Sequence, residues 1–184
     1  MSSFPQLTEP LTDGAVVLRD YVERDIPEIL IAYQDDPNLH VLTGEDRPPS
    51  GAELGRLAER EWADRNAGDR AALSILEPDS DTCAGQVRVQ PVDWDHSRAE
   101  ISIWLAPQVR GRGLGRAALR VAGGWLLGPC GIARVELIVE PGNAPMTHAA
   151  QGAGFVREGI LREYVRKRGK GVDVAIMSLI QGDL

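Results

Sequence analysis

The chain has 184 residues, 43% of them hydrophobic and 26% charged, and its formal net charge is −7. This balance is typical of one water-soluble globular domain, expected over residues 1–184, and the acidic net charge argues against nonspecific nucleic-acid binding. The first residues lack a secretory signal pattern, no apolar stretch is long enough to cross a membrane, and two cysteines are too few for a disulfide framework, so we expect a cytoplasmic protein with reduced thiols and no membrane partner.

The first half of the chain contains patterns of both strands and helices. Residues 15–21 have the composition of a first strand, and residues 23–34 carry apolar side chains at helical spacing. Residues 37–50 are rich in turn formers and predict a loop. Ser50 and Glu53 then have the spacing of a capping box, which predicts the start of a second helix. Three strands are expected next, at residues 71–77, 83–94 and 99–106.

The second half begins with the most regular pattern of the chain. From Leu114 to Trp125, apolar residues recur at i, i+3, i+4, i+7, i+8 and i+11, which predicts a helix with one continuous apolar stripe. The elements that follow are a buried strand at residues 132–140, a short helix at 144–151 and a hairpin around residues 169–171. Together, these patterns predict one mixed α/β domain.

The run RGRGLG, residues 110–115, lies between a predicted strand and a predicted helix. It is not a P-loop, because no Gly-Lys-Ser/Thr occurs, and it is a poor dinucleotide fingerprint, because Arg116 or Ala118 stands where the third glycine should be. Glycines with positive φ let a backbone approach an anion, and free N–H groups at a helix start bind a pyrophosphate. Arg110 and Arg112 can add charged hydrogen bonds. An ordinary turn is the alternative interpretation.

Two longer segments carry a resemblance to a known family. The stretches "AEISIWLAPQVRGRGLGRAAL" and "VELIVEPGNAPMTHAAQGAGFVREGILREY" resemble the GNAT acyl-CoA N-acyltransferases. Within that superfamily they are most similar to the group of RimJ and RimL, the ribosomal-protein alanine N-acetyltransferases. The resemblance runs from about residue 17 to residue 180. It implies a single α/β domain with a mixed, mostly antiparallel sheet, a splayed strand pair at the acyl-CoA site and flanking helices.

The same resemblance implies acetyl-CoA as the acyl donor and no metal. In this family the strand before the glycine loop pairs with the pantetheine arm like an added strand. This places Ile103, Trp104 and Leu105 beside the pantetheine, and it places Asn143 within reach of it. Phe155 would pack near the same arm or in the core. The residues implied to hold the pyrophosphate are Arg110, Gly111, Arg112, Gly113, Leu114, Gly115 and Arg116.

Acyl transfer to an amine needs a base for the amine, N–H donors for the thioester carbonyl and a proton for the leaving thiolate. Neither cysteine has a histidine partner nearby in sequence, so we expect direct attack in a ternary complex. Glu100 lies on the strand face that flanks the thioester and is the candidate base, with Glu158 and Glu163 as competitors. Met146 stands where the family often has a serine, which leaves Tyr164 as the candidate acid.

Charge is distributed unevenly along the chain. Residues 13–64 contain thirteen acidic and five basic side chains, whereas residues 101–184 contain six acidic and eleven basic ones. These charges are either solvated surface, or they favour an anion near the second half and a cationic or amine acceptor near the first. Trp62 is expected in the core rather than in the acceptor pocket. The three histidines, scattered among turns and a helix, do not predict a metal site.

The expected function is transfer of an acetyl group from acetyl-CoA to a primary amine, on a protein N-terminus or a small molecule. The alternatives are another acyl donor or acceptor, such as succinyl-CoA or an aminoglycoside, and a catalytically silent acyl-CoA-binding module. The sequence leaves a homodimer open.

Overall fold

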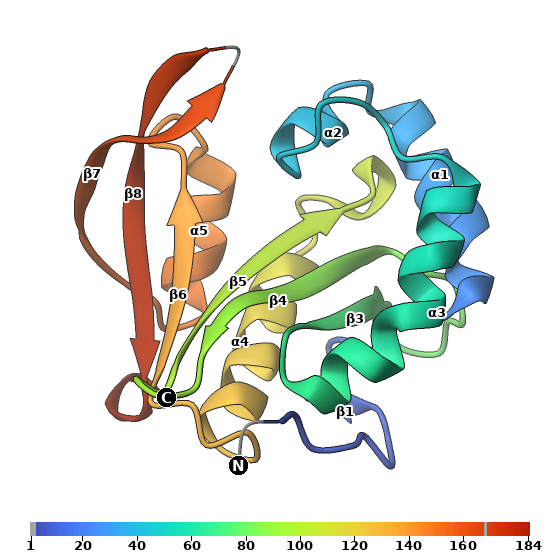
Figure 1. Ribbon diagram of the computed structural model, residues 1–184, viewed down its shortest axis with the longest axis horizontal. Coiled ribbons are helices and arrows are strands. Elements are labelled where there is room, and N and C mark those ends of the chain that lie inside the picture. Colours follow the sequence, from blue (N-terminus) through green and yellow to red (C-terminus); the bar gives the residue numbers. More distant parts are fainter. Residues whose placement is uncertain (1–2, 168) are drawn as a thin grey trace.

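One sheet runs through the whole protein. The computed structural model describes residues 3–167 and 169–184, and its strands follow the order β1-β2-β3-β4-β5-β6-β8-β7 (Figure 1). All neighbouring strands are antiparallel except β5 and β6, which are parallel. The strands are β1 (Leu11–Thr12), β2 (Val17–Asp20), β3 (Ala71–Leu76), β4 (Gly85–Asp93), β5 (Arg98–Leu105), β6 (Arg134–Val139), β7 (Val156–Lys167) and β8 (Lys170–Ile180). The predicted mixed, mostly antiparallel sheet is confirmed.

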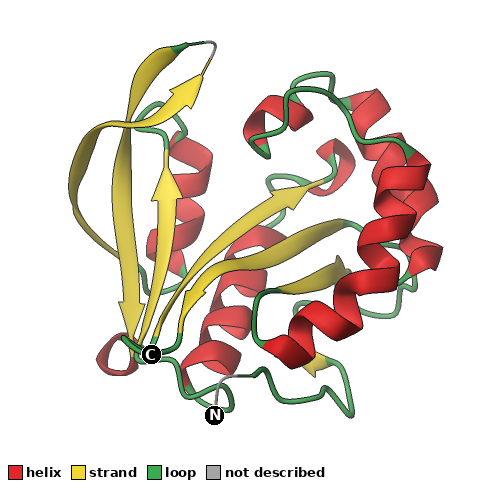
Figure 2. Ribbon diagram, in the orientation of Figure 1, coloured by secondary structure: helices red, strands yellow, loops and turns green. Residues whose placement is uncertain are grey.

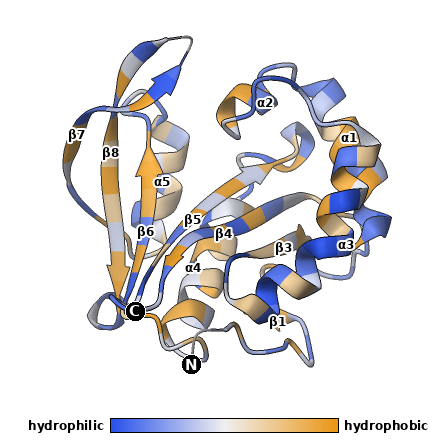
Figure 3. Ribbon diagram, viewed as in Figure 1, coloured by the Kyte–Doolittle hydropathy of each residue, from blue (hydrophilic) through white to orange (hydrophobic). Residues whose placement is uncertain are grey.

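Helices cover both faces of this sheet (Figure 2). The helices are α1 (Ile26–Asp35), α2 (Leu39–Leu42), α3 (Gly51–Ala67), α4 (Leu114–Leu127) and α5 (Ala144–Gly152). The larger apolar core lies between the sheet and α4 with α5, and a smaller core lies under α1, α2 and α3. This division agrees with the hydropathy of the helices, since α4 is largely hydrophobic and α3 largely hydrophilic (Figure 3). None of the described helices combines the length and the apolar character that crossing a membrane would require.

Local sequence signals account for the two longest helices. At the start of α3, the Glu53 N–H donates to Ser50 Oγ at 3.3 Å, and the Ser50 N–H donates to Glu53 Oε2 at 2.8 Å. This is the predicted capping box, and the left-handed Gly68 ends the helix. In α4 the predicted stripe from Leu114 to Trp125 is buried except at Val121, which is partly buried. Both predictions are therefore confirmed, because each depends on contacts within one or two turns of helix.

Two expectations for the first half of the chain were wrong, and one short strand was missed. The predicted loop at residues 37–50 contains α2, which forms because Leu39 is fully buried in the smaller core. The short edge strand β1 was not predicted. Trp62 is 71% exposed instead of buried. The buried stripe of α3 passes through Leu54, Glu61 and Arg65, and at 3.6 residues per turn Trp62 lies roughly 80° away from Leu54.

Candidate active site

Strands β5 and β6 separate partway along their length. They pair over four positions, from Arg98 opposite Arg134 to Ile101 opposite Leu137, and then diverge (Figure 1). The Ala106 N–H donates to the Ala84 carbonyl on the β4 side at 2.8 Å. Because backbone direction alternates along a strand, the peptide groups of Ile103 and Leu105 face the gap, and those of Trp104 face β4. The gap therefore offers a free strand edge to an extended ligand.

The side chain of Trp104 belongs to the smaller core rather than to this gap. It is 6% exposed and packs near Tyr33, with ring centroids 6.1 Å apart. Ile103 and Leu105 point to the opposite face and pack against the larger core. Phe155 is also a core residue, with 2% of its surface exposed. Of these predicted cofactor residues, only Ile103 and Leu105 present their backbone to the gap.

The glycine loop after β5 has the geometry of an anion site. Gly111 and Gly113 have φ of 76° and 84°, values that favour glycine. A methyl group on Gly111 would meet no atom within 4 Å, and one on Gly113 would meet only Arg116 Nη2 at 4.0 Å. No N–H from Gly111 to Arg116 donates a hydrogen bond to a described residue. Open space, free N–H groups and the start of α4 together fit a diphosphate.

Arginines around the loop have different tasks. Arg110 donates from Nε to the Leu105 carbonyl at 2.9 Å and pairs with Asp36 at 2.7 Å, so it ties the loop to β5 and to the end of α1. Arg112 is exposed and lies 3.4 Å from Glu77. Arg116 makes no ion pair with a described residue. The last two guanidinium groups are therefore the ones available to a bound anion.

Leu114 and Gly115 complete the loop structurally. Leu114 begins α4 and is buried in the larger core. A methyl group on Gly115 would lie 3.4 Å from Leu105 Cδ1, an ordinary van der Waals distance, so the start of α4 packs against the end of β5 at this position.

Asn143 lies at the end of the loop that joins β6 to α5. Its Oδ1 accepts a hydrogen bond from the Met146 N–H at 3.2 Å, and its carbonyl accepts one from the Thr147 hydroxyl at 3.1 Å. The side-chain NH₂ of Asn143 donates to no described residue. Asn143 is thus the N-cap of α5, and the Thr147 hydroxyl, next to Met146, is bound to a backbone carbonyl one turn earlier.

Glu100 lies at the closed end of the gap. It is opposite Glu136 on the neighbouring parallel strand, one position before the last pair between β5 and β6. Ala99 and Ile101 face the larger core, so Glu100 faces the other side of the sheet. Burial raises the pKa of Glu100 above its ordinary value, and the charge of Glu136 raises it further. A carboxylate with a raised pKa at this place is suited to accept a proton.

The two competing carboxylates are less suited to this task. Glu158 accepts two hydrogen bonds from Arg134, at 2.7 and 2.6 Å, and one from Ser178 at 2.7 Å. The bond from Arg134, followed by that from Ser178, lowers the pKa of Glu158 to about 2. Glu163 is exposed on the outer strand β7. The ion pair with Arg134 therefore makes Glu158 a weak base, because its carboxylate has a low affinity for a proton.

Tyr164 lies on β7, the outer strand of the sheet. The pairing of β7 with β8 shifts register between Leu161 and Val165. At the end of β7, Lys167 donates to the Val41 carbonyl of α2 at 3.3 Å. Tyr164 is 57% exposed, and its hydroxyl makes no hydrogen bond with a described residue. The hairpin thus contacts α2 through Lys167, and the hydroxyl of Tyr164 is exposed.

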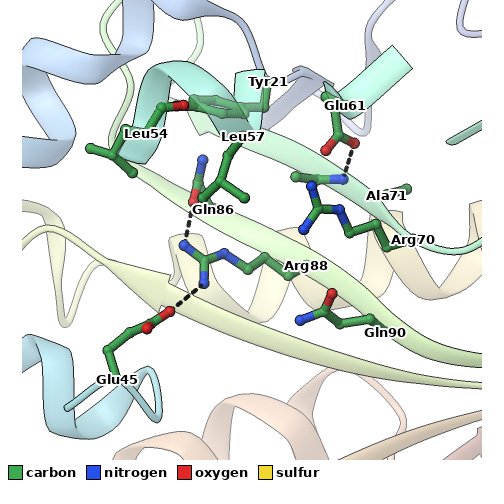
Figure 4. A pocket seen from close by; sticks show the side chains of 11 residues that line it. Tyr21, Glu45, Leu54, Leu57, Glu61, Arg70, Ala71, Gln86, Arg88 and Gln90 are labelled. Carbon is green, nitrogen blue, oxygen red and sulfur yellow. Dashed lines mark hydrogen bonds and ion pairs between the residues drawn. The ribbon is translucent and has the colours of Figure 1, made fainter. Parts of the chain in front are cut away.

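A pocket lies between α3 and strands β3 and β4 (Figure 4), and strand β5 separates it from the gap. Its volume is about 110 Å³, and its polar wall is formed by Glu45, Glu61, Arg70, Arg88 and Gln90. Sequence analysis did not single out these residues. A signal was present, because Gln86, Arg88 and Gln90 alternate with apolar residues in β4 and so share one face.

The cysteines are unsuited to nucleophilic catalysis. Burial raises the pKa of Cys83 to about 11 and the pKa of Cys130 to about 12, so both are thiols at neutral pH. Across residues 3–167 and 169–184, no cluster of three or more His, Cys, Asp or Glu side chains could hold a metal ion.

The acidic first half of the chain is largely neutralised by ion pairs. Seven of its thirteen carboxylates lie within 4.0 Å of an arginine. These pairs are Asp13–Arg120, Asp20–Arg65, Asp25–Arg19, Asp36–Arg110, Glu45–Arg88, Glu53–Arg47 and Asp64–Arg70. Any attraction of an acceptor must therefore come from particular side chains rather than from the whole segment.

Comparison with known proteins adds a family to this geometry. Residues 15–156 match the family described as acetyltransferase (GNAT) domain. A protein of Bacillus licheniformis, "Uncharacterized N-acetyltransferase p20", is 28% identical over 114 residues. That match covers 62% of this chain and 64% of the relative, which is less than two thirds of the relative's length.

Solved structures share the fold. RimJ of Mycobacterium smegmatis, in complex with CoA-disulfide, has a TM-score of 0.81 at 22% identity and covers 96% of this chain and 88% of its own. Spermidine N-acetyltransferase of Vibrio cholerae, in complex with CoA and spermine, has a TM-score of 0.79 at 23% identity, with 93% and 98% covered. At these identities the comparison shows a common fold.

Proposed function

This chain belongs to the acetyltransferase (GNAT) domain family, and we propose on that premise that it transfers an acetyl group from acetyl-CoA to a primary amine. The observation that carries the proposal is the gap between β5 and β6, with a glycine loop of free N–H groups at one end and a half-buried carboxylate at the other. One end suits an anion, and the other suits proton transfer. The acceptor is an amine on a protein N-terminus or on a small molecule.

The proposed donor site uses backbone more than side chains. The N–H and carbonyl of Ile103 and the N–H of Leu105 would pair with an extended arm, because the Leu105 carbonyl already accepts from Arg110, and the N–H groups of residues 111–116 would hold the pyrophosphate. Arg112 and Arg116 would add charge, and the free NH₂ of Asn143 would donate to the arm. Trp104 supports this edge from the smaller core. Acetyl-CoA supplies the activated thioester.

The proposed chemistry is direct attack by the amine. Glu100 accepts the amine's proton, and its raised pKa makes it a better base than an exposed glutamate. A backbone N–H at the edge of β5 donates to the thioester carbonyl as negative charge develops there. Tyr164 is the proposed donor of the proton that the leaving thiolate takes up. The high thiol pKa values of Cys83 and Cys130 support a mechanism without a covalent enzyme intermediate.

Thiol release from acetyl-CoA tests the proposal. The assay is run across a panel of amines, and mass spectrometry must find the acetyl group on the amine. Release without an acetylated amine would indicate thioester hydrolysis and contradict the proposal. Tight acetyl-CoA binding with no acetylated amine would favour the silent binding module, in which Met146 replaces a needed hydroxyl. Succinyl-CoA in the same assay tests the choice of donor.

A further inference from the structure

The pocket over β3 and β4 lies on the same face of the sheet as Glu100 of the neighbouring strand β5. In the β4–β5 pairing, Arg88 is opposite Ser102, and Gln86 is opposite Trp104. Side chains directly opposite on one face lie about 5 Å apart at Cβ, and diagonal neighbours about 7–8 Å. Ser102 is the next residue after Glu100 on the same face of β5. A ligand with its amine at Glu100 would therefore have its neighbouring atoms within reach of Arg88.

Arg88 is an arginine without a complete partner. Its side chain is 20% exposed, its Nη1 lies 3.6 Å from Glu45, and its Nη2 donates to Gln86 Oε1 at 3.3 Å (Figure 4). Both contacts are long for charge-assisted hydrogen bonds. By contrast, Arg19 and Arg134 each make a two-pronged contact with a carboxylate, with distances from 2.6 to 2.8 Å. The guanidinium group of Arg88 can therefore make shorter hydrogen bonds with the carboxylate of a ligand than it makes with Glu45.

The other charged groups of the pocket each have a partner. Arg70 lies 2.5 Å from Asp64, but its buried Nε and Nη2 make no hydrogen bond with a described residue. Glu61 accepts the Ala72 N–H at 2.5 Å, and burial raises its pKa, so it favours its neutral form more than an ordinary glutamate does. Glu45 also lines the pocket, but it is 48% exposed, and its one ion pair with a described residue is the long contact to Arg88. An incoming anion can therefore replace Glu45 without breaking a buried pair.

We infer that Arg88 binds a carboxylate carried by the acceptor amine, which displaces Glu45 while the amine lies at Glu100. This inference rests on the proposed transferase function and names its substrate class. The pocket volume of about 110 Å³ is smaller than the roughly 150 Å³ cavity that admits benzene, so the pocket suits a short group rather than a long polyamine. The carboxylate comes either from a small amino acid or from an acidic side chain near a protein N-terminus.

Matched acceptors test the inference and separate these two sources. L-alanine and β-alanine are each compared with their primary amides, and the dipeptide amide Ala-Glu-NH₂ is compared with Ala-Gln-NH₂. Spermidine serves as the cationic probe. The wild-type protein should prefer the carboxylate member of at least one pair by about tenfold or more in kcat/KM. A preference confined to the free amino acids assigns a small acceptor, and one confined to the dipeptides assigns an N-terminus.

Two variants should move this preference in opposite directions. Arg88→Gln should reduce the preference to within about twofold, measured as the ratio to wild type so that differences in amine basicity cancel. Glu45→Gln should lower the KM for carboxylate acceptors, because it removes the group they displace. Arg47→Gln is the matched control, since Arg47 also pairs with a carboxylate, Glu53, but lies outside the pocket. A purely structural Arg88–Glu45 pair would make both variants worse.

Several results would overturn the inference. These are equal use of carboxylate and amide acceptors, a preference for spermidine that Arg88→Gln does not change, and weaker binding of carboxylate acceptors by Glu45→Gln. Unchanged acetyl-CoA affinity shows that each variant has folded.

If no amine is acetylated, calorimetry measures binding of the same probes to the CoA-saturated protein. Carboxylate binding that Arg88→Gln abolishes would then support the inference although the transferase proposal fails. Binding that does not depend on Arg88 would overturn it.

Discussion

Gly113→Asp should weaken acetyl-CoA binding by at least about tenfold, roughly 1.4 kcal/mol. Gly113 precedes α4 with φ of 84°, and the space where a side chain would project contains only Arg116 Nη2, at 4.0 Å. An aspartate would therefore place its charge in the space proposed for the pyrophosphate. Two unit charges about 6 Å apart interact by about 3 kcal/mol at an effective dielectric constant of 20, and salt reduces this value.

Backbone strain must be separated from this effect. A residue other than glycine costs roughly 1–2 kcal/mol in the left-handed region, so the variant loses folding stability as well as affinity. Gly131 provides the control, because its φ is 68° and a side chain there would meet nothing within 4 Å. It follows the opposite end of α4 from the loop. Gly131→Asp should lose comparable stability but keep the affinity for acetyl-CoA.

Isothermal titration calorimetry gives the affinity, and urea unfolding gives the stability. A folded Gly113→Asp protein that binds acetyl-CoA as well as the wild type would refute the loop as the anion site. Equal loss of affinity in the Gly131→Asp control would show that stability, rather than the site, decides binding.

Three further predictions concern carboxylates. Glu100→Gln should lower kcat by about a hundredfold while calorimetry finds an unchanged acetyl-CoA affinity; a loss of tenfold or less would point to another base or to none. Glu136→Gln removes a negative charge that raises the pKa of Glu100. The acidic limb of the kcat/KM profile should therefore move to lower pH. If it does not move, this limb reports the titration of a group other than Glu100. Glu158 has a pKa of about 2 in the folded protein against about 4.3 when unfolded, so its contribution to stability is present above the unfolded value and lost as the pH falls toward 2. In urea unfolding, the free energy of unfolding of Glu158→Gln should therefore fall less steeply with decreasing pH than that of the wild type. An equally steep fall in the variant would contradict this role of Glu158.

Sequence patterns predicted those parts of the protein that depend on local contacts. The capping box at Ser50 and the apolar stripe of α4 require only residues within a few turns, and both are present. The geometry of the glycine run was also predictable from the sequence, because positive φ values and the start of a helix are local properties of this segment. The resemblance to the GNAT family extended this reading to the diverging strands, and that divergence is present.

Contacts between distant segments were not accessible from the sequence. Glu136 lies beside Glu100 only because β5 and β6 pair in parallel, with α4 between them in the chain. Arg88 has no close ion pair, because the carboxylate of Glu45, which lies far away in the sequence, is 3.6 Å from its Nη1. The alternation in β4 could have marked Arg88 as a polar residue on one face. It could not have shown that this face borders Glu100.

The central claim is that the gap between β5 and β6 and the adjoining glycine loop hold acetyl-CoA. Amide hydrogen exchange with and without acetyl-CoA tests this claim most directly. The N–H groups of residues 111–116 make no hydrogen bond with a described residue, and alternation points those of Ile103 and Leu105 into the gap. Acetyl-CoA should slow exchange at these two segments, while the loop around Gly131 stays unchanged. Protection elsewhere, with fast exchange remaining at both segments, would contradict the account.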